Sequence, residues 1–416
     1  MPQQADAARL STFGAESTTT ETTFFGGTFD TDIKRSGNGS YRFNVTDNVG
    51  ILYAFATTTP YTSPLYSRMY FRAEDLPSEP VGIVSFVHGT ESTYANLRVN
   101  ADGTLTWEDG AGTTLGTTTE MLSADTWYRI EVRYDPGDDV QVRLDGVEVI
   151  SETVSHGTDA AVVFMGVCAG GGVYDCGGGG SGVTTADFYF DDIAVNDSNG
   201  SNQTSWPGEG KVVHMQPDGG AGDNNDANSG SCADVDEVEF DDSTTAATLG
   251  DNNDILDCTV ESSSSAGLSS TDSITLVQVG VRTAASGIFQ TYSSTLRIKS
   301  ASGGSVLESG TQSTLSANGA YFTNYTNVIA ISVDYRLTSY VDPTTGVAWT
   351  PTGTNSLDNM QIGTQAIDAD PDINVTALWA VVEYTEYVEP TRKVLRLGKV
   401  RLGGSAFVVE NQWDVI

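Results

Sequence analysis

Two similar acidic turns are the residues of this sequence best suited to hold a metal ion. The run Gly-Asp-Asn-Asn-Asp occurs twice, ending at Asp226 and at Asp254. Calcium takes about six to eight oxygens from carboxylates, amides and backbone carbonyls, and such turns offer them densely. Neither copy has the spacing of an EF-hand loop, so solvated turns without an ion are the alternative. We predict calcium as the only candidate cofactor, with these carboxylates as ligands: Asp223, Asp226, Asp251 and Asp254.

The four cysteines fall into two pairs that are close in the sequence. Cys168 and Cys176 flank a glycine-rich run, whereas Cys232 and Cys258 flank an acidic one. We predict two local disulfides, with free thiols as the alternative, because a sequence cannot assign the pairing. A zinc site is not expected, since the chain has no Cys-x-x-Cys motif and only three histidines.

Aromatic residues beside turns are candidates for contact with a glycan, because sugars stack on exposed rings next to hydrogen-bonding side chains. Trp107, Tyr174 and Trp206 sit beside turn residues and form this candidate set. The remaining tryptophans in strand-like runs, Trp127, Trp349 and Trp379, are expected in the core instead.

One cluster of carboxylates is spaced like a catalytic motif. Asp234, Asp236 and Glu239 are similar to the E-x-D-x-x-E of jelly-roll glucanases, in which the two Glu act as nucleophile and general acid. Here the first position is Asp, which is one methylene shorter, so we expect an acidic strand edge. No G-x-S-x-G elbow lies near any histidine. We therefore predict no catalytic residue and no enzyme.

The composition favours an all-β protein. Glycine is abundant at 45 of 416 residues, and Thr, Val and Tyr are frequent, which suits pleated strands joined by tight turns. The formal net charge is −35. Such an acidic surface repels nucleic acid and anionic membranes, so neither is expected as a partner. The length suits two domains and a tail.

Short alternating strands separated by turn residues run through most of the chain. For example, the turn at 100–103 joins two apolar runs at 95–99 and 104–107, and Asp145-Gly146 makes another tight turn. Turn signals at intervals of about eight to twelve residues are typical of a β-sandwich. The fold expected is therefore two β-sandwich, jelly-roll-like domains with an N-terminal arm and a C-terminal strand-forming tail.

The first of these regions resembles the concanavalin A-like, laminin-G-type jelly roll. The resemblance rests on the runs 36–43, 127–134, 140–147 and 190–195, which look like the family's opening strand, central hairpin and closing strand. It implies the fold, whereas the function stays open because this fold hosts lectins, hydrolases and assembly modules. The expected boundaries are arm 1–23, concanavalin A-like domain 24–197, linker 198–210, second β-sandwich 211–388 and tail 389–416.

The order of motifs around both domains resembles bacteriophage structural proteins. The jelly roll ends in Asp-Asp-Ile-Ala-Val at 191–195, followed by Trp-Pro-Gly at 206–208, and the second domain carries late runs at 346–350 and 357–363. This resemblance implies a virion protein of the head or the tail.

The C-terminal tail reverses the charge of the rest of the chain. Its bases alternate in part with apolar residues, as in an exposed strand. We predict either that it adds as an edge strand to a neighbouring molecule, or that it covers an edge of its own domain. The bases of this assembly tail are Arg392, Lys393, Arg396, Lys399 and Arg401.

Three functions follow, in descending order of expectation. The first is a virion structural protein, either a capsid decoration or head fibre or a tail component, with an outward lectin-like domain. Its partners would be other virion proteins, copies of itself and a cell-surface glycan. The N-terminal ten residues have no signal-peptide pattern, which favours release by lysis and a virion location over an extracellular one. The second is a secreted carbohydrate-binding module of a salt-adapted microbe, and the third is a glycosidase.

Overall fold

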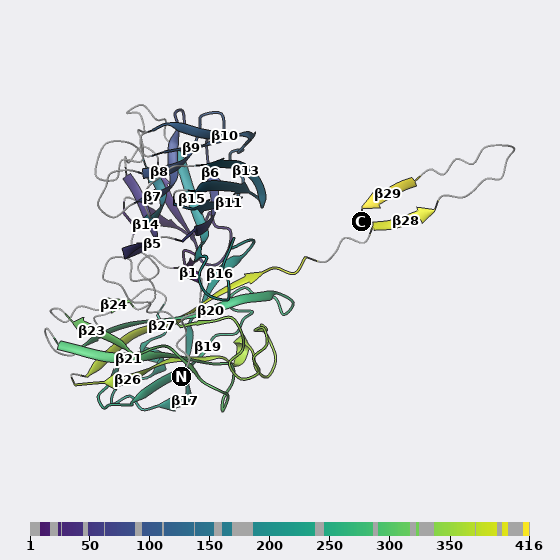
Figure 1. Cartoon of the computed structure of the whole chain (residues 1–416). Coiled ribbons are helices and arrows are strands. Elements are labelled where there is room, and N and C mark those ends of the chain that lie inside the picture. Colours follow the sequence, from purple (N-terminus) through teal and green to yellow (C-terminus); the bar gives the residue numbers. More distant parts are fainter. Residues whose placement is uncertain are drawn as a thin grey trace.

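The computed structural model shows an all-β chain with two short 3-10 helices among the described residues (Figure 1). Two β-sandwiches lie next to each other, and a small two-stranded sheet stands apart from both. The all-β prediction is therefore confirmed. No helix among the described residues is long and apolar enough to cross a membrane. The described residues are 9–16, 24–25, 27–44, 49–61, 63–87, 94–109, 112–136, 138–153, 160–168, 186–237, 245–285, 290–316, 322–323, 337–370, 372–388, 393–397 and 411–415.

One sheet of the first sandwich has the order β13-β12-β11-β6-β15-β4-β3, and β1 pairs with the second half of β15. Its strands are β1 (Arg9–Phe13), β3 (Thr28–Asp30), β4 (Ser40–Asn44), β6 (Leu65–Ala73), β11 (Tyr128–Tyr134), β12 (Asp139–Leu144), β13 (Val147–Thr153) and β15 (Asp187–Asp197). The facing sheet has the order β10-β9-β8-β7-β14-β5-β2. Its strands are β2 (Phe24–Phe25), β5 (Val49–Tyr61), β7 (Val81–Val87), β8 (Tyr94–Val99), β9 (Thr104–Glu108), β10 (Thr114–Met121) and β14 (Ala160–Cys168).

Local turn chemistry fixes the register of several hairpins in this sandwich. Asp145 and Gly146 have φ angles of 50° and 85°. A two-residue hairpin loop of type I′ needs such left-handed values at both positions, and this turn brings Leu144 opposite Val147. The expected hairpin through Asn100 is also present as β8 and β9, with Val99 opposite Leu105.

The second sandwich is built from two six-stranded sheets. The first sheet has the order β16-β27-β20-β24, and in addition β18 pairs with β27 and β25 pairs with β20. Its strands are β16 (Lys211–Met215), β18 (Ala247–Leu249), β20 (Ser273–Ala285), β24 (Phe322–Thr323), β25 (Leu337–Ser339) and β27 (Ile373–Thr385). The second sheet has the order β17-β19-β26-β21-β22, and in addition β23 pairs with β21. Its strands are β17 (Pro217–Asn225), β19 (Ile255–Val260), β21 (Gln290–Lys299), β22 (Leu307–Glu308), β23 (Gln312–Ser316) and β26 (Gln361–Asp368). The 3-10 helices are η1 (Cys232–Asp234) and η2 (Leu357–Asn359).

The two sandwiches share one hydrophobic cluster at their junction. Val212 of β16 and Trp379 of β27 belong to the same buried cluster as the core of the first sandwich. Phe13 of β1 is in this cluster and is fully buried. Burial of this apolar surface on both sides makes the junction part of the core instead of a loose contact between domains.

Two segments expected to be loose are therefore built into the body. Within the expected arm 1–23, residues 9–13 form strand β1, while 1–8 and 17–23 lie outside the described residues. The expected linker 198–210 lies against the outer face of β6 and β11. There the Gly208 amide donates to Glu131 Oε1 at 2.7 Å, and Arg68 Nη1 donates to the Gly208 carbonyl at 3.3 Å.

The last two strands, β28 (Lys393–Leu397) and β29 (Asn411–Val415), form an antiparallel sheet of their own. We call this pair the C-terminal ribbon. It pairs with no strand of either sandwich among the described residues, and Figure 1 shows it in yellow, away from both.

Candidate binding and assembly sites

A fully buried ion triad joins the two sandwiches. Glu383 of β27 accepts a hydrogen bond from Arg68 Nη1 of β6 at 2.5 Å through Oε1, and from Arg9 Nη1 of β1 through Oε2. All three side chains are inaccessible to solvent. Burial alone would raise the pKa of Glu383, but the two guanidinium groups outweigh it and hold the pKa below its ordinary value. The carboxylate therefore stays charged between two cations.

A second polar cluster lies at the same junction, where β15 has a bulge between Asp191 and Ala194. Asp192 has a φ of 48°, and its Oδ1 accepts the Val212 amide at 2.6 Å and the Ser36 hydroxyl at 2.5 Å. Arg35 Nη1 pairs with Oδ2 at 2.5 Å. Burial, followed by the charge of Asp192, raises the pKa of Asp191 well above its ordinary value. Asp192 thus links Val212 of the second sandwich to Ser36 and Arg35 of the first.

The calcium prediction for Asp223 is not supported by its surroundings. Its oxygens accept from Lys299 Nζ at 3.1 Å, the Ser302 hydroxyl at 2.6 Å and the Gly303 amide at 2.7 Å. The Ser302 and Gly303 hydrogen bonds are the largest causes that hold the pKa of Asp223 far below its ordinary value. Protein donors, including a cation, thus occupy the lone pairs that a metal ion would need.

The second predicted calcium loop is a hydrogen-bonded turn. Asp254 Oδ2 accepts the Gly250 amide at 3.1 Å and the Asp251 amide at 2.8 Å. The four predicted ligands, Asp226 among them, do not gather into one site: the single group of three close acids in the described part of the chain is Asp135, Asp138 and Asp139. Arg133 of β11 already pairs with two of that group, Asp135 and Asp139.

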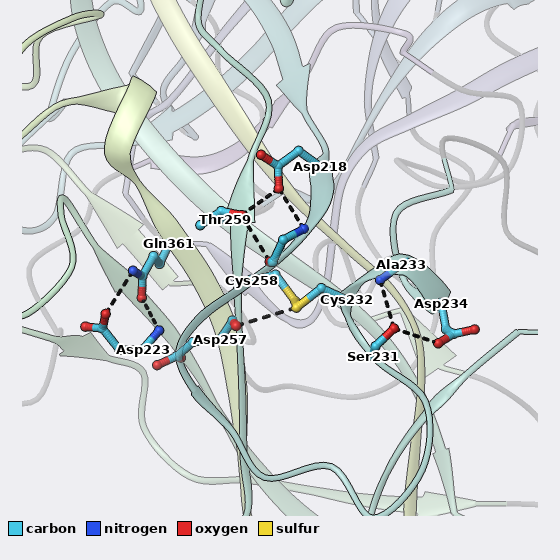
Figure 2. Close-up of a disulfide and its surroundings, with 11 residues drawn as sticks. Asp218, Asp223, Ser231, Cys232, Ala233, Asp234, Asp257, Cys258, Thr259 and Gln361 are labelled. Carbon is cyan, nitrogen blue, oxygen red and sulfur yellow. Dashed lines mark hydrogen bonds between the residues drawn. A yellow bond between two sulfur atoms is a disulfide. The ribbon is translucent and has the colours of Figure 1, made fainter.

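The predicted disulfide between Cys232 and Cys258 is present and joins η1 to β19 (Figure 2). Next to it Asp257 accepts from Lys299 Nζ at 2.9 Å and from Arg297 Nε at 3.1 Å, all three side chains being nearly fully buried. The other expected pair is not described, because Cys176 and the side chain of Cys168 lie outside the described residues.

The described part of the acidic motif that is similar to a glucanase site, residues 234–237, does not form a strand. Asp234 ends the 3-10 helix η1, where Ser231 donates its hydroxyl to Asp234 Oδ2 at 3.0 Å. The pKa of Asp236 is raised above its ordinary value, mainly by burial, and the nearby negative charges of Asp234 and Asp218 raise it further. Glu239, the third residue of the motif, lies outside the described residues.

Of the three predicted glycan-contact residues, one is buried, one lies outside the described residues and one lies at the surface. Trp107 is fully buried in the core of the first sandwich, because its position on β9 points inward, so it offers no platform. Tyr174 lies outside the described residues. Trp206 is half-buried at the surface, with its ring 5.5 Å from that of Tyr66 and the Arg143 guanidinium 4.0 Å above it.

Among the five predicted assembly bases, Lys393 and Arg396 lie on β28 of the C-terminal ribbon, and the others fall outside the described residues. The register places Leu395 opposite Trp413. It also places Lys393 opposite Val415 and Leu397 opposite Asn411.

A scan against models of known protein families gives no match, and neither does a search of curated proteins. Among solved structures, the chain is similar to cellulose induced protein Cip1 at 15% identity and a TM-score of 0.32, over 44% of this chain and 89% of that one. Alginate lyase Aly36B is 10% identical with a TM-score of 0.31, over 48% and 100%. A Trypanosoma rangeli sialidase in complex with sialic acid is 9% identical with a TM-score of 0.35, over 45% and 30%. Similarities this low carry no argument about function.

The sequence reasoning missed the residues that join the sandwiches. Arg9 and Glu383 are 374 positions apart, and neither stands in a recognisable motif. One signal was available in the sequence. Glu383 is the one charged residue in the run 377–384, which is otherwise apolar and strand-forming. A charge buried in such a strand needs a partner, because an unpaired buried charge is too costly.

Proposed function

We propose that this chain is a virion structural protein, a capsid decoration protein, head fibre or tail component, that acts by assembly and surface binding. The observation that carries the proposal is the C-terminal ribbon, which stands apart from a body whose two sandwiches share a core. A two-stranded sheet alone is marginally stable in water, so a ribbon of this kind suits a connector that is completed by a neighbour.

The body has the properties that a particle component needs. The buried triad around Glu383, the Asp192 cluster and the Cys232–Cys258 disulfide each tie distant segments together. The order of motifs from the end of the jelly roll through the second domain supplies the specific resemblance to phage structural proteins.

The test is whether the chain travels with particles. Particles released from the culture that makes the chain would be separated on a density gradient, and each fraction would be analysed by quantitative mass spectrometry. We expect the chain to peak with the nucleic acid of intact particles at a fixed ratio to the major particle protein. A chain found only in the soluble fractions would overturn the virion proposal.

A carbohydrate-binding module is the second candidate, and the surface around Trp206 favours it. Trp206, Tyr66 and Arg143 combine aromatic rings with a hydrogen-bond donor on the outer face of β6 and β12. Glycan-array binding by the full chain, lost in Trp206→Ala and kept in Trp349→Phe, would support this candidate. The control lies in the core of the second sandwich. No binding to any glycan would remove it.

A further inference from the structure

The C-terminal segment that contains the ribbon is opposite in charge to the rest of the chain. Residues 391–416 contain five bases and two acids, which gives a formal charge of +3. Because the whole chain carries −35, the remaining residues carry −38. Opposite charges steer association and fix which surfaces meet. The ribbon therefore suits an acidic partner, and the body of this chain is such a surface.

The ribbon also has unmet pairing capacity. In the described part of the chain, β28 pairs only with β29, which leaves one edge of each strand open. An open strand edge offers a row of backbone donors and acceptors to a further strand. These open edges belong to β28 (Lys393–Leu397) and β29 (Asn411–Val415).

We infer that the C-terminal ribbon of one copy docks on the acidic body of a second copy of this chain. The inference rests on the proposed assembly function and names the partner of the ribbon. The C-terminal segment of a second copy is a worse partner, because two segments 391–416 that each carry a formal charge of +3 repel. Within the described residues the ribbon pairs with no strand of its own body, and Figure 1 shows it away from both sandwiches.

A mixing experiment separates these arrangements. The full chain and a chain that ends at Val388 would be studied by sedimentation velocity, first separately and then together, with the shorter chain carrying a fluorescent label. We expect the full chain to self-associate and the shorter chain to stay monomeric. The full chain should nevertheless bind the shorter one, because the shorter chain keeps the acidic body. Failure of the two to bind, while the full chain still self-associates, would mean ribbon-to-ribbon pairing and would overturn the inference.

The shorter chain must be shown to fold, so its thermal unfolding would be compared with that of the full chain. All strand pairs of both sandwiches fall within residues 9–388, so we expect the same transition. If the shorter chain unfolds, a charge variant still tests the inference. Lys393→Glu in the full chain should weaken self-association by about threefold to tenfold.

The matched control is Lys34→Glu, which makes the same change in charge at an exposed site of the first sandwich. It should leave self-association unchanged or strengthen it slightly. Equal weakening by both variants would show that only net charge matters and would overturn docking through the ribbon.

Failure of this inference can be told apart from failure of the proposed function. A full chain that stays monomeric at every salt concentration, yet peaks with particles on the gradient, overturns docking between copies and keeps the virion role. A chain that self-associates through its ribbon but is absent from particles supports docking and overturns the virion role.

Discussion

At the scale of single residues, Glu383 is the buried charge that connects the two sandwiches. It is a buried acid on a central strand of the second sandwich, and its two partners belong to the first. Replacing a buried pair by apolar residues is often neutral, whereas removing one member leaves the other charge uncompensated. The triad therefore makes the fold of each sandwich depend on the presence of the other.

We predict that Glu383→Gln destabilises the chain by about 3–5 kcal/mol, because Arg9 and Arg68 would remain buried without a counter-charge. The measurement is the free energy of unfolding from denaturant titration. Glu386→Gln is the control: Glu386 is exposed and pairs with Lys211 Nζ at 2.5 Å, so its loss should cost only about 0–1 kcal/mol. Equal effects of the two variants would contradict the role given to the triad.

The same residue predicts how stability depends on pH. The pKa of Glu383 is lowered in the folded state. Its contribution is thus complete above its unfolded pKa of about 4.3, and is lost as the pH falls through the lower folded pKa. Asp191 has the opposite sign, because its raised pKa gives stability below its unfolded pKa that is lost as the pH rises through the folded one. We expect acid unfolding below about pH 4, with a shallower pH dependence in Glu383→Gln than in the unmodified chain. Parallel curves for the two proteins would disprove the assignment.

At the scale of elements, strand β1 behaves as part of the core. Phe13 is fully buried in the shared cluster, whereas Leu10 on the same strand is half-buried at its border. We predict that Phe13→Ala costs about 3–5 kcal/mol and Leu10→Ala clearly less, measured by denaturant unfolding. If β1 were a dispensable arm, neither substitution would change the unfolding midpoint.

Elements whose signals are local could be predicted from the sequence, and those set by distant contacts could not. The Asp145-Gly146 turn prescribes its own left-handed backbone, so the hairpin of β12 and β13 follows from two residues. Strand β1 has no such signal, since it forms only because β15 and the junction accept it. The predicted strand at Asp234 was wrong because Ser231 caps a 3-10 turn there, next to the Cys232 disulfide.

The candidate site shows the same division. A repeat of Asp and Asn turns indicates oxygen ligands, but it cannot reveal that Lys299, 76 residues away, reaches Asp223. In the same way, Trp107 next to a turn seemed exposed, although its position on β9 turns the ring into the core. The ribbon, in contrast, could be predicted as strand-forming from the alternation of apolar residues and bases around Arg396.

At the scale of the whole molecule, the shared core predicts that the two sandwiches unfold together. Domains joined by a thin contact usually melt separately, whereas a common apolar cluster with a buried triad couples them. We expect a single calorimetric transition whose calorimetric and van't Hoff enthalpies agree. Val281→Ala, deep in the second sandwich, should lower the temperature of that one transition without splitting it. Val212→Asp, which puts an unpaired charge into the junction, should separate it into two. Two transitions in the unmodified chain would mean that the junction is a contact between independent domains.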